Sequence, residues 1–310
     1  MKNNFYSILR IEHWFKNIII FPGIIAAAIL KKNVIFNESL FLEIILCIIS
    51  TSLIASSNYL INEYLDRKED KYHPIKKKRF FVKKKISFFY IFLIYLFCIF
   101  LGFLFSKNFS TAYKVILFIF VLCGIFYNVW PFRLKNYPIV DVLFESINNI
   151  IRFLLGWLII LPNQFPPISL ILAFWMGGAY LMNVKRFAEY RFINNSKIAG
   201  LYRKSFIFYT ENFLLIMSFL YALFTIFFTT IFLIKYKIEF IISMPFVSIL
   251  FAYYLKLGLD KKSLTQNPEK LYKSKELMII LILVIISLLF CAIINLPILN
   301  ILTVPLDFNS

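Results

Sequence analysis

Four oxygen-bearing side chains lie close together in one short polar segment of the sequence. Asn62, Asp66 and Asp70 follow one another at intervals of four residues, and Glu63 stands next to the first of them. No helix-breaking residue interrupts the segment, so we expect a helix that continues through Asp70 with these side chains on one face. Oxygen ligands without His or Cys suit a hard cation, and magnesium commonly takes one or two carboxylates together with water and substrate phosphates. The segment therefore predicts a Mg²⁺ site with a bound diphosphate. The alternative is a solvated helix end with ion pairs along the helix.

A second polar stripe occurs in an otherwise apolar stretch. Asp141, Glu145, Asn148 and Arg152 are spaced so that they return to one face of a helix. Ionisable groups inside an apolar span are unfavourable in lipid and usually line a bundle interior or a cavity. The stripe predicts an internal polar chamber with Asp141 and Arg152 on its wall. The alternative is a structural network between helices.

Basic and aromatic side chains suited to phosphate groups occur in three further segments. Tyr127, Arg133 and Lys135 stand just before the second stripe. Guanidinium and ammonium groups bind phosphate oxygens through charge-assisted hydrogen bonds. The segment after Asp70 carries a basic run that either screens phosphate charge or anchors a loop to anionic lipid. The last segment is basic around one carboxylate and contains Lys185, Arg186, Glu189, Arg191, Arg203, Lys204 and Tyr209.

Membrane-spanning helices are the elements that must position these groups. Of the 310 residues, 61% are hydrophobic and 16% are charged, which is outside the usual balance of a soluble domain. Apolar runs long enough to cross a hydrocarbon core about 30 Å thick recur along almost the whole chain. No polar stretch is long enough for a separate soluble domain, so residues 1–310 are predicted to form one all-α membrane domain. The expected spans cover residues 17–30, 41–60, 87–106, 112–130, 138–161, 167–183, 213–234, 240–256 and 277–302.

The distribution of basic residues predicts the orientation of this bundle. With the N-terminus on the cytoplasmic side, 27 of the 34 Lys and Arg residues fall in cytoplasmic segments and six fall outside. That bias is the pattern that sets membrane topology, and it predicts an N-in, C-out bundle. Because orientation accounts for the net charge of +18, we expect no nucleic-acid partner.

These motifs together resemble the UbiA superfamily of intramembrane prenyltransferases. The first motif of that family is written N-D-x-x-D-x-x-x-D and lies between the second and third helices. Here it runs from Asn62 to Asp70, with Glu63 in place of the usual Asp. The resemblance implies a UbiA-type bundle of nine helices and a Mg²⁺ cofactor held by Asn62, Glu63, Asp66 and Asp70. Members that move an isoprenyl group from its diphosphate to an aromatic acceptor carry a second acidic motif, D-x-x-x-D, after the sixth helix.

Within the superfamily, the chain looks most like the decaprenyl-phosphate phosphoribosyltransferase branch, over about residues 10–215. The start from Arg10 to Asn17 resembles the opening R-P-x-x-W-x-K-N of that branch, with Ile11 in place of Pro. Where the second acidic motif is expected, the sequence is basic, which favours a second phosphate-bearing substrate. The resemblance implies substrate contacts at Lys16, Asn17, Tyr127, Lys135, Asp141, Arg152, Lys185, Arg186, Glu189 and Arg203.

The branch resemblance implies transfer of phosphoribose from phosphoribosyl pyrophosphate to a polyprenyl phosphate, for envelope glycan assembly. The reaction is expected at the cytoplasmic face of a bacterial plasma membrane, with Asn62, Asp66 and Asp70 as the catalytic residues that stabilise the leaving diphosphate. The first alternative is transfer of an isoprenyl group from its diphosphate to an aromatic or other acceptor. The second is a flippase or transporter of lipid-linked sugars, although the sequence shows neither inverted repeats nor matching broken helices.

Overall fold

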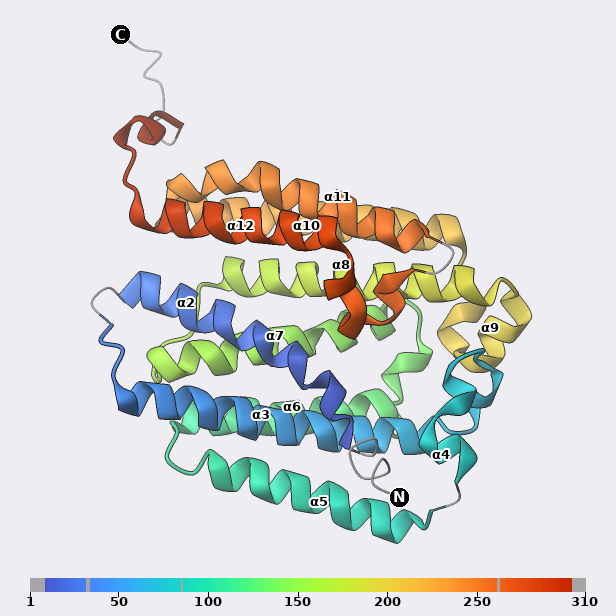
Figure 1. The fold of residues 1–310 in the computed structure, drawn as a ribbon. Coiled ribbons are helices and arrows are strands. Elements are labelled where there is room, and N and C mark those ends of the chain that lie inside the picture. The colour runs from blue at the N-terminus through green and yellow to red at the C-terminus, as the bar shows by residue number, and fades with distance from the viewer. Residues whose placement is uncertain (1–8, 32–33, 85, 261–262, 303–310) are drawn as a thin grey trace.

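The computed structural model describes residues 9–31, 34–84, 86–260 and 263–302 of the chain. These residues form helices, turns and loops, and none of them lies in a β-strand (Figure 1). Nine helical segments in this described part are long and apolar enough to cross a membrane, which confirms the predicted number of spans. Each predicted span overlaps one of these segments. The N-in, C-out orientation stays a prediction.

The nine spans follow one another along the chain and are joined by shorter helical turns. The first combines the 3₁₀ segment η1 (Ile11–Ile19) with α2 (Ile20–Lys31), and the eighth combines η6 (Ile238–Ser243) with α11 (Met244–Leu259). The other spans are α3 (Glu38–Leu65), α5 (Phe88–Phe105), α6 (Thr111–Asn128), α7 (Val140–Ile160), α8 (Ile168–Ile193), α10 (Glu211–Tyr236) and α12 (Lys275–Ile293). The connecting turns are η2 (Glu69–Tyr72), η3 (Lys76–Lys78), α4 (Phe80–Lys83), η4 (Leu134–Asn136), α9 (Ser196–Tyr202), η5 (Lys204–Ile207), η7 (Leu264–Gln266) and η8 (Pro268–Lys273), and η9 (Pro297–Leu302) follows α12.

Polar residues fix where several spans begin. The side chains of Asn37, Ser110, Thr210 and Ser274 each accept a hydrogen bond from a backbone N–H in the first turn of the following helix. These N–H groups have no partner within the helix, so the capping side chain satisfies a donor that lipid cannot. The caps therefore set the starts of α3, α6, α10 and α12.

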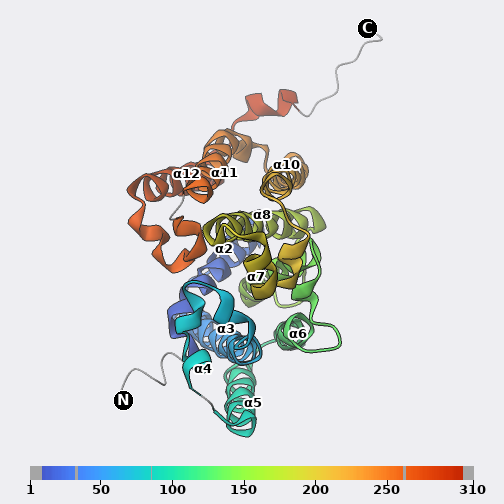
Figure 2. The same cartoon turned by 90° about the vertical axis from the view of Figure 1, so that its right-hand side faces the viewer.

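Helix α7, the fifth span, is the centre of the bundle. In the end-on view, α7 lies with α2 and α8 on one side and α3 and α6 on the other (Figure 2). Two glycines bring α2 and α7 into close contact: a Cβ atom on Gly23 would lie 2.0 Å from the Phe153 carbonyl oxygen, and one on Gly156 would lie 2.0 Å from that of Ile20. Small residues allow such backbone approach between membrane helices. The contact holds η1, which leads directly into α2, beside α7.

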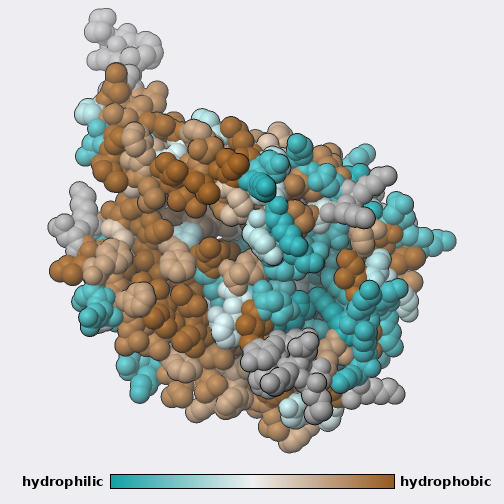
Figure 3. Space-filling view, viewed as in Figure 1, coloured by the Kyte–Doolittle hydropathy of each residue, from teal (hydrophilic) through white to brown (hydrophobic). Residues whose placement is uncertain are grey.

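One end of the bundle is polar and the rest of the visible surface is apolar. In Figure 3, hydrophobic residues cover most of the face, whereas hydrophilic residues gather at the end that carries α4 and α9 in Figure 1. Exposed apolar side chains on α5, α10 and α12 are consistent with helices that face lipid. The polar end carries the loops whose basic residues predict a cytoplasmic location.

Three predicted helix ends are wrong, and one of them is that of the last span, which is predicted to run to residue 302 but ends at Ile293. The α-helix that carries Asn62 ends at Leu65 and gives way to a turn and η2, because the Arg67 guanidinium donates to the Tyr64 carbonyl oxygen (2.6 Å) and satisfies the end of the helix. Conversely, α8 continues ten residues past its predicted end at residue 183, so Lys185, Arg186 and Glu189 lie on its last turns and not in a loop. Ion pairs with distant segments allow Arg186 and Glu189 to stay in a buried helix.

Candidate active site

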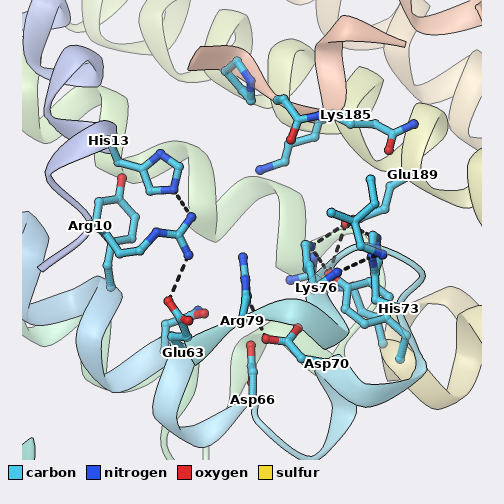
Figure 4. A pocket seen from close by; sticks show the side chains of 18 of the residues that line it. Arg10, His13, Glu63, Asp66, Asp70, His73, Lys76, Arg79, Lys185 and Glu189 are labelled. Atoms are coloured by element: carbon cyan, nitrogen blue, oxygen red, sulfur yellow. Dashed lines mark hydrogen bonds and ion pairs between the residues drawn. The ribbon is translucent and has the colours of Figure 1, made fainter. Parts of the chain in front are cut away.

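A cavity of about 390 Å³ lies at the polar end of the bundle. Segments far apart in the sequence form its wall: η1, the end of α3, the loop that carries η2 and η3, the last turns of α8, and the loop between α11 and α12. Figure 4 shows Glu63, Asp66 and Asp70 on one side of this cavity and Lys185 on the other. The polar groups that the sequence carries in separate segments therefore share one chamber.

The acidic floor of the cavity consists of Asn62, Glu63, Asp66 and Asp70. Each of its carboxylates contacts a basic side chain from another segment. Arg10 Nη1 lies 2.9 Å from Glu63, and Arg79 Nη1 lies 2.8 Å from Asp70. Asp66 contacts both Lys135 and, at 3.1 Å, Arg133 Nη2. Asn62 donates to Asn128 Oδ1 (2.6 Å), which also accepts a hydrogen bond from Lys135 (2.9 Å). The predicted convergence of the four residues is thus present, although the helix does not continue to Asp70.

The two aspartates of the floor differ in acidity. Burial raises the pKa of the Asp70 carboxyl, and the neighbouring Arg79 offsets this only in part. At Asp66 burial acts in the same direction, but the ammonium of Lys135 and the guanidinium of Arg133 outweigh it and hold the pKa below its ordinary value. Burial also lowers the pKa of Lys135 to about 8, although Asp66 favours its charged form. Asp66 is therefore the more firmly ionised of the two.

The donor set of the floor suits a hard cation that shares its coordination with a substrate. Among the described residues, no group of three or more His, Cys, Asp or Glu side chains is already arranged around a common metal position. Magnesium does not require such a cage, because it usually binds one or two carboxylates and completes its shell with water and phosphate oxygens. Asp66 and Asp70 line the same cavity as Asn62 and Glu63 and offer only oxygen ligands. The floor fits a metal–diphosphate complex better than a bare ion.

A pair of arginines forms the centre of a basic wall, which we define as Lys185, Arg186 and Arg203. Arg186 contacts Glu145, and its Nε lies 3.4 Å from Asp141 Oδ2. Arg203 donates to the Tyr127 hydroxyl (2.7 Å), which itself donates to Glu145 (2.7 Å). Burial lowers the pKa of the Arg203 guanidinium, but its neighbours Tyr127 and Asp141 raise it by more, so the pKa lies above its ordinary value. The two arginines of the wall therefore present permanent positive charge to the cavity.

Asp141 anchors this wall from behind. Its side chain is fully buried, and it accepts hydrogen bonds from the Tyr209 hydroxyl and from Ser205 Oγ (3.1 Å). Together with its contacts to Arg186 and, at 3.7 Å, Arg203, these bonds fix the carboxylate on all sides. Asp141 is thus a positioning residue for the two arginines.

A second buried carboxylate, Glu189, ties the loop after Asp70 to α8 and α9. Lys76 from η3 contacts Glu189, and His73 Nε2 lies 3.3 Å from it. The Tyr202 hydroxyl from α9 donates to the same carboxylate oxygen (3.1 Å). The other oxygen lies 3.4 Å from Arg186 Nη1. We call His73, Lys76, Glu189 and Tyr202 the Glu189 cluster; both oxygens of its carboxylate are occupied by basic or hydroxyl partners.

Comparison with known proteins shows which family has this architecture. The model of the UbiA prenyltransferase family matches residues 19–273. The chain belongs to the UbiA prenyltransferase family. It is accordingly a transferase, and its acidic floor lies in the part of the sequence that the family model covers, whereas the cavity residues Arg10, His13 and Lys16 precede that part. A search of curated proteins gave no match.

Solved structures of UbiA proteins share the fold. A UbiA homolog from Archaeoglobus fulgidus bound to DMAPP and Mg²⁺ aligns with a TM-score of 0.68 at 17% identity, over 93% of this chain and 99% of that one. The same homolog bound to GPP and Mg²⁺ gives 0.68 at 18% identity with the same coverage. A digeranylgeranylglyceryl phosphate synthase aligns with a TM-score of 0.61 at 16% identity, over 93% of this chain and 97% of that one. At these identities the similarity establishes a common fold.

The UbiA cavity gathers most, but not all, of the predicted site residues. Those that line it are Lys16, Asn62, Glu63, Asp66, Asp70, Tyr127, Lys185, Arg186, Glu189 and Arg203. Lys135 lines a small adjoining cavity of about 40 Å³ with Asp66, and Arg152 lines another of about 70 Å³ with Asn62. Asn17 and Asp141 line none of these cavities. Asn17 accepts a hydrogen bond from Arg152 Nε (2.7 Å), and Asp141 contacts Arg186. Each therefore supports an arginine that lines a cavity.

Several lining residues of this UbiA site escaped prediction. Arg10 and His13 belong to the same opening motif as Lys16, and Tyr59 lies one turn before Glu63, so their positions carried a usable signal. Tyr202 and Asn267 reach the cavity only through the packing of α9 and of the loop between α11 and α12. Nothing local in the sequence around them indicates that contact.

Proposed function

We propose that this protein transfers the phosphoribosyl group of phosphoribosyl pyrophosphate to a polyprenyl phosphate, in a Mg²⁺-dependent reaction. The reaction takes place at the cytoplasmic face of a bacterial plasma membrane, and the protein belongs to the decaprenyl-phosphate phosphoribosyltransferase branch of its family. The polyprenyl chain stays in the bilayer, so the cavity has to admit only the two phosphate-bearing head groups.

The surroundings of Glu189 are the observation that carries this proposal. A second magnesium ion on a diphosphate would need further free carboxylates as ligands, because magnesium binds oxygen anions. Each floor carboxylate pairs with one or two basic side chains, whereas the buried carboxylate of Glu189 contacts four groups, which are His73, Lys76, Arg186 and Tyr202. Its neighbours Lys185 and Arg186 are cations that suit an anionic group directly. The cavity thus favours one metal-bound diphosphate and a second phosphate held by basic side chains.

Prenyl transfer to an aromatic or other acceptor is the second candidate. It is favoured by the structures of the Archaeoglobus fulgidus homolog, which binds DMAPP or GPP together with Mg²⁺. That reaction would be better supported if another carboxylate lay near Glu189. Glu145 and Asp141 share the Arg186 guanidinium with Glu189 and are neutralised by it. Glu211 is the nearest acidic residue along the chain, but its carboxylate pairs with Arg191 at 3.4 Å and is half exposed. The basic wall therefore argues for the phosphoribosyl group.

In the proposed step, an oxygen of the acceptor phosphate forms a bond to the anomeric carbon of the ribose. The bond from that carbon to pyrophosphate breaks, and pyrophosphate leaves with the bonding electrons. Bound Mg²⁺ supplies charge neutralisation for this leaving group. Asn62, Asp66 and Asp70 would hold this metal, and Lys135 would donate to the diphosphate oxygens on which charge develops. The attacking phosphate is already anionic, so no enzyme group has to remove a proton.

Transfer by purified protein in detergent tests the proposal. One reaction contains phosphoribosyl pyrophosphate labelled in the ribose, polyprenyl phosphate and Mg²⁺, and a second contains a labelled isoprenyl diphosphate with 4-hydroxybenzoate. Asp66→Ala removes a floor carboxylate, and Glu211→Ala, which removes a half-exposed surface carboxylate, is the matched control. Ribose label in the lipid fraction, lost in Asp66→Ala and kept in Glu211→Ala, is the expected result. Prenylated benzoate without labelled lipid would refute phosphoribosyl transfer and establish the second candidate.

A further inference from the structure

Two lysines of the cavity lack the ion pairs that all its other enclosed cations make. Arg10, Lys76 and Arg79 contact Glu63, Glu189 and Asp70, and the two arginines of the basic wall contact Glu145 and Asp141. Lys16 and Lys185 line the same cavity and pair with no carboxylate in the described part of the chain. Lys78 also lacks such a pair, but its side chain is exposed to solvent.

The two lysines reach this cavity from different segments. Lys16 lies in η1, and Lys185 lies in the last turns of α8. Lys16 Nζ lies 5.3 Å from the centre of the Tyr59 ring, and Figure 4 shows Lys185 across the cavity from Asp66 and Asp70 with no interaction drawn to it. Two half-buried ammonium groups near each other are unfavourable unless an anion joins them.

The imidazole of His13 adds a third unused donor next to Lys16. Arg10 Nη2 contacts His13 Nε2, and a guanidinium can only donate, so Nε2 accepts that bond and the proton lies on Nδ1. His13 Nδ1 is buried and has no hydrogen-bond partner among the described residues. A buried donor without an acceptor is unfavourable, which again indicates an anionic or oxygen-bearing ligand here.

We propose that Lys16 and Lys185 form a subsite for a phosphate monoester dianion, separate from the diphosphate position on the acidic floor. A phosphate monoester carries close to two negative charges at neutral pH and three terminal oxygens, so it can accept from both ammonium groups and neutralise both. This assignment builds on the proposed reaction, in which two groups have that chemistry: the head group of the polyprenyl phosphate and the 5-phosphate of the ribose donor.

Binding measurements with purified full-length protein distinguish the two sources. The probes are polyprenyl phosphate beside the corresponding polyprenol, ribose 5-phosphate beside ribose, and pyrophosphate with Mg²⁺ as the reporter of the floor. Lys16→Met and Lys185→Met keep the apolar stem and remove the charge, Lys185→Arg keeps the charge, and Lys78→Met is the control for an exposed lining lysine. Loss of a charge-assisted hydrogen bond predicts an affinity lower by about 10-fold or more.

We expect Lys16→Met and Lys185→Met to lower the affinity for one of the two phosphate monoesters by about 10-fold or more. The affinity for pyrophosphate with Mg²⁺ should change by less than about twofold. Lys185→Arg and Lys78→Met are expected to bind like wild type. The monoester that weakens identifies the source. The thermal unfolding midpoint without ligand should not fall in either Met variant, because each removes a like-charge contact. Unchanged affinity for both monoesters, or an equal loss for pyrophosphate, would overturn the subsite. Absence of ribose transfer with these binding effects intact would instead refute only the proposed reaction.

Discussion

Replacing Glu189 by Gln removes the charge at the centre of the Glu189 cluster while keeping its shape. Breaking a buried ion pair by removing one partner costs about 3–5 kcal/mol. Here the remaining amide oxygen still accepts one hydrogen bond, and the Lys76 side chain is 21% exposed, so water relieves part of the loss. We therefore expect about 2 kcal/mol, which is roughly a 30-fold increase in the population whose loop has come away from α8.

Limited trypsin digestion reports this opening directly. The loop carries exposed lysines at Lys71, Lys77 and Lys78, and cleavage of a folded segment tracks its open population when opening is fast. Glu189→Gln should raise the cleavage rate about 30-fold, whereas Glu211→Gln should not change it, because an exposed pair contributes little. The half-saturating Mg²⁺ concentration for transfer should stay constant in Glu189→Gln. A higher Mg²⁺ requirement with an unchanged cleavage rate would show that Glu189 is a metal ligand and refute its role in holding the loop.

Two further predictions concern the bundle and the floor. Gly156→Ala places a methyl group 2.0 Å from the Ile20 carbonyl oxygen and should lower the thermal unfolding midpoint by about 5 °C, whereas Gly177→Ala, whose nearest contact is 3.5 Å away, should leave it unchanged. Because burial lowers the pKa of Lys135 to about 8, the protonated ammonium that attracts the donor is lost as the pH rises above that value. The kcat/KM for the donor should then fall by up to about tenfold per pH unit, and Lys135→Arg, which stays charged, should abolish the fall.

Local signals explain which parts of the fold could be predicted from the sequence. Lipid requires long apolar runs, so all nine spans were visible, and the spacing of Asn62, Asp66 and Asp70 depends on one segment only. The end of α8 was not predictable in this way. Arg186 and Glu189 look like loop residues until their partners Glu145 and Lys76, from distant segments, are known.

The same distinction applies to the site. Lys16, Lys185 and Arg203 lie in polar segments that stood out in the sequence, and the structure brings them to one cavity. Asn17 and Asp141 stood out equally but line no cavity, because Asn17 accepts from Arg152, which lines the small adjoining cavity, and Asp141 contacts Arg186, which lines the main one. Whether a side chain lines the cavity depends on how the helices pack, and the spacing of residues within one segment does not show it.

The pairing of every floor carboxylate with a cation determines how the floor would bind its donor. Magnesium alone would have to separate Asp70 from Arg79 and Asp66 from Lys135 while leaving those cations without a partner. Pyrophosphate alone would meet the carboxylates as like charges. Bound together, the metal replaces the cations at the carboxylates and the phosphate oxygens receive the displaced cations, so that no charge is left unpaired in a half-buried cavity.

We therefore expect titration calorimetry to give at least about 10-fold tighter binding of pyrophosphate with Mg²⁺ than without it. Arg79→Met should reduce that coupling, because Asp70 is then free to bind Mg²⁺ without displacing a cation. Equal pyrophosphate affinity with and without Mg²⁺ would contradict an exchange of partners on the floor.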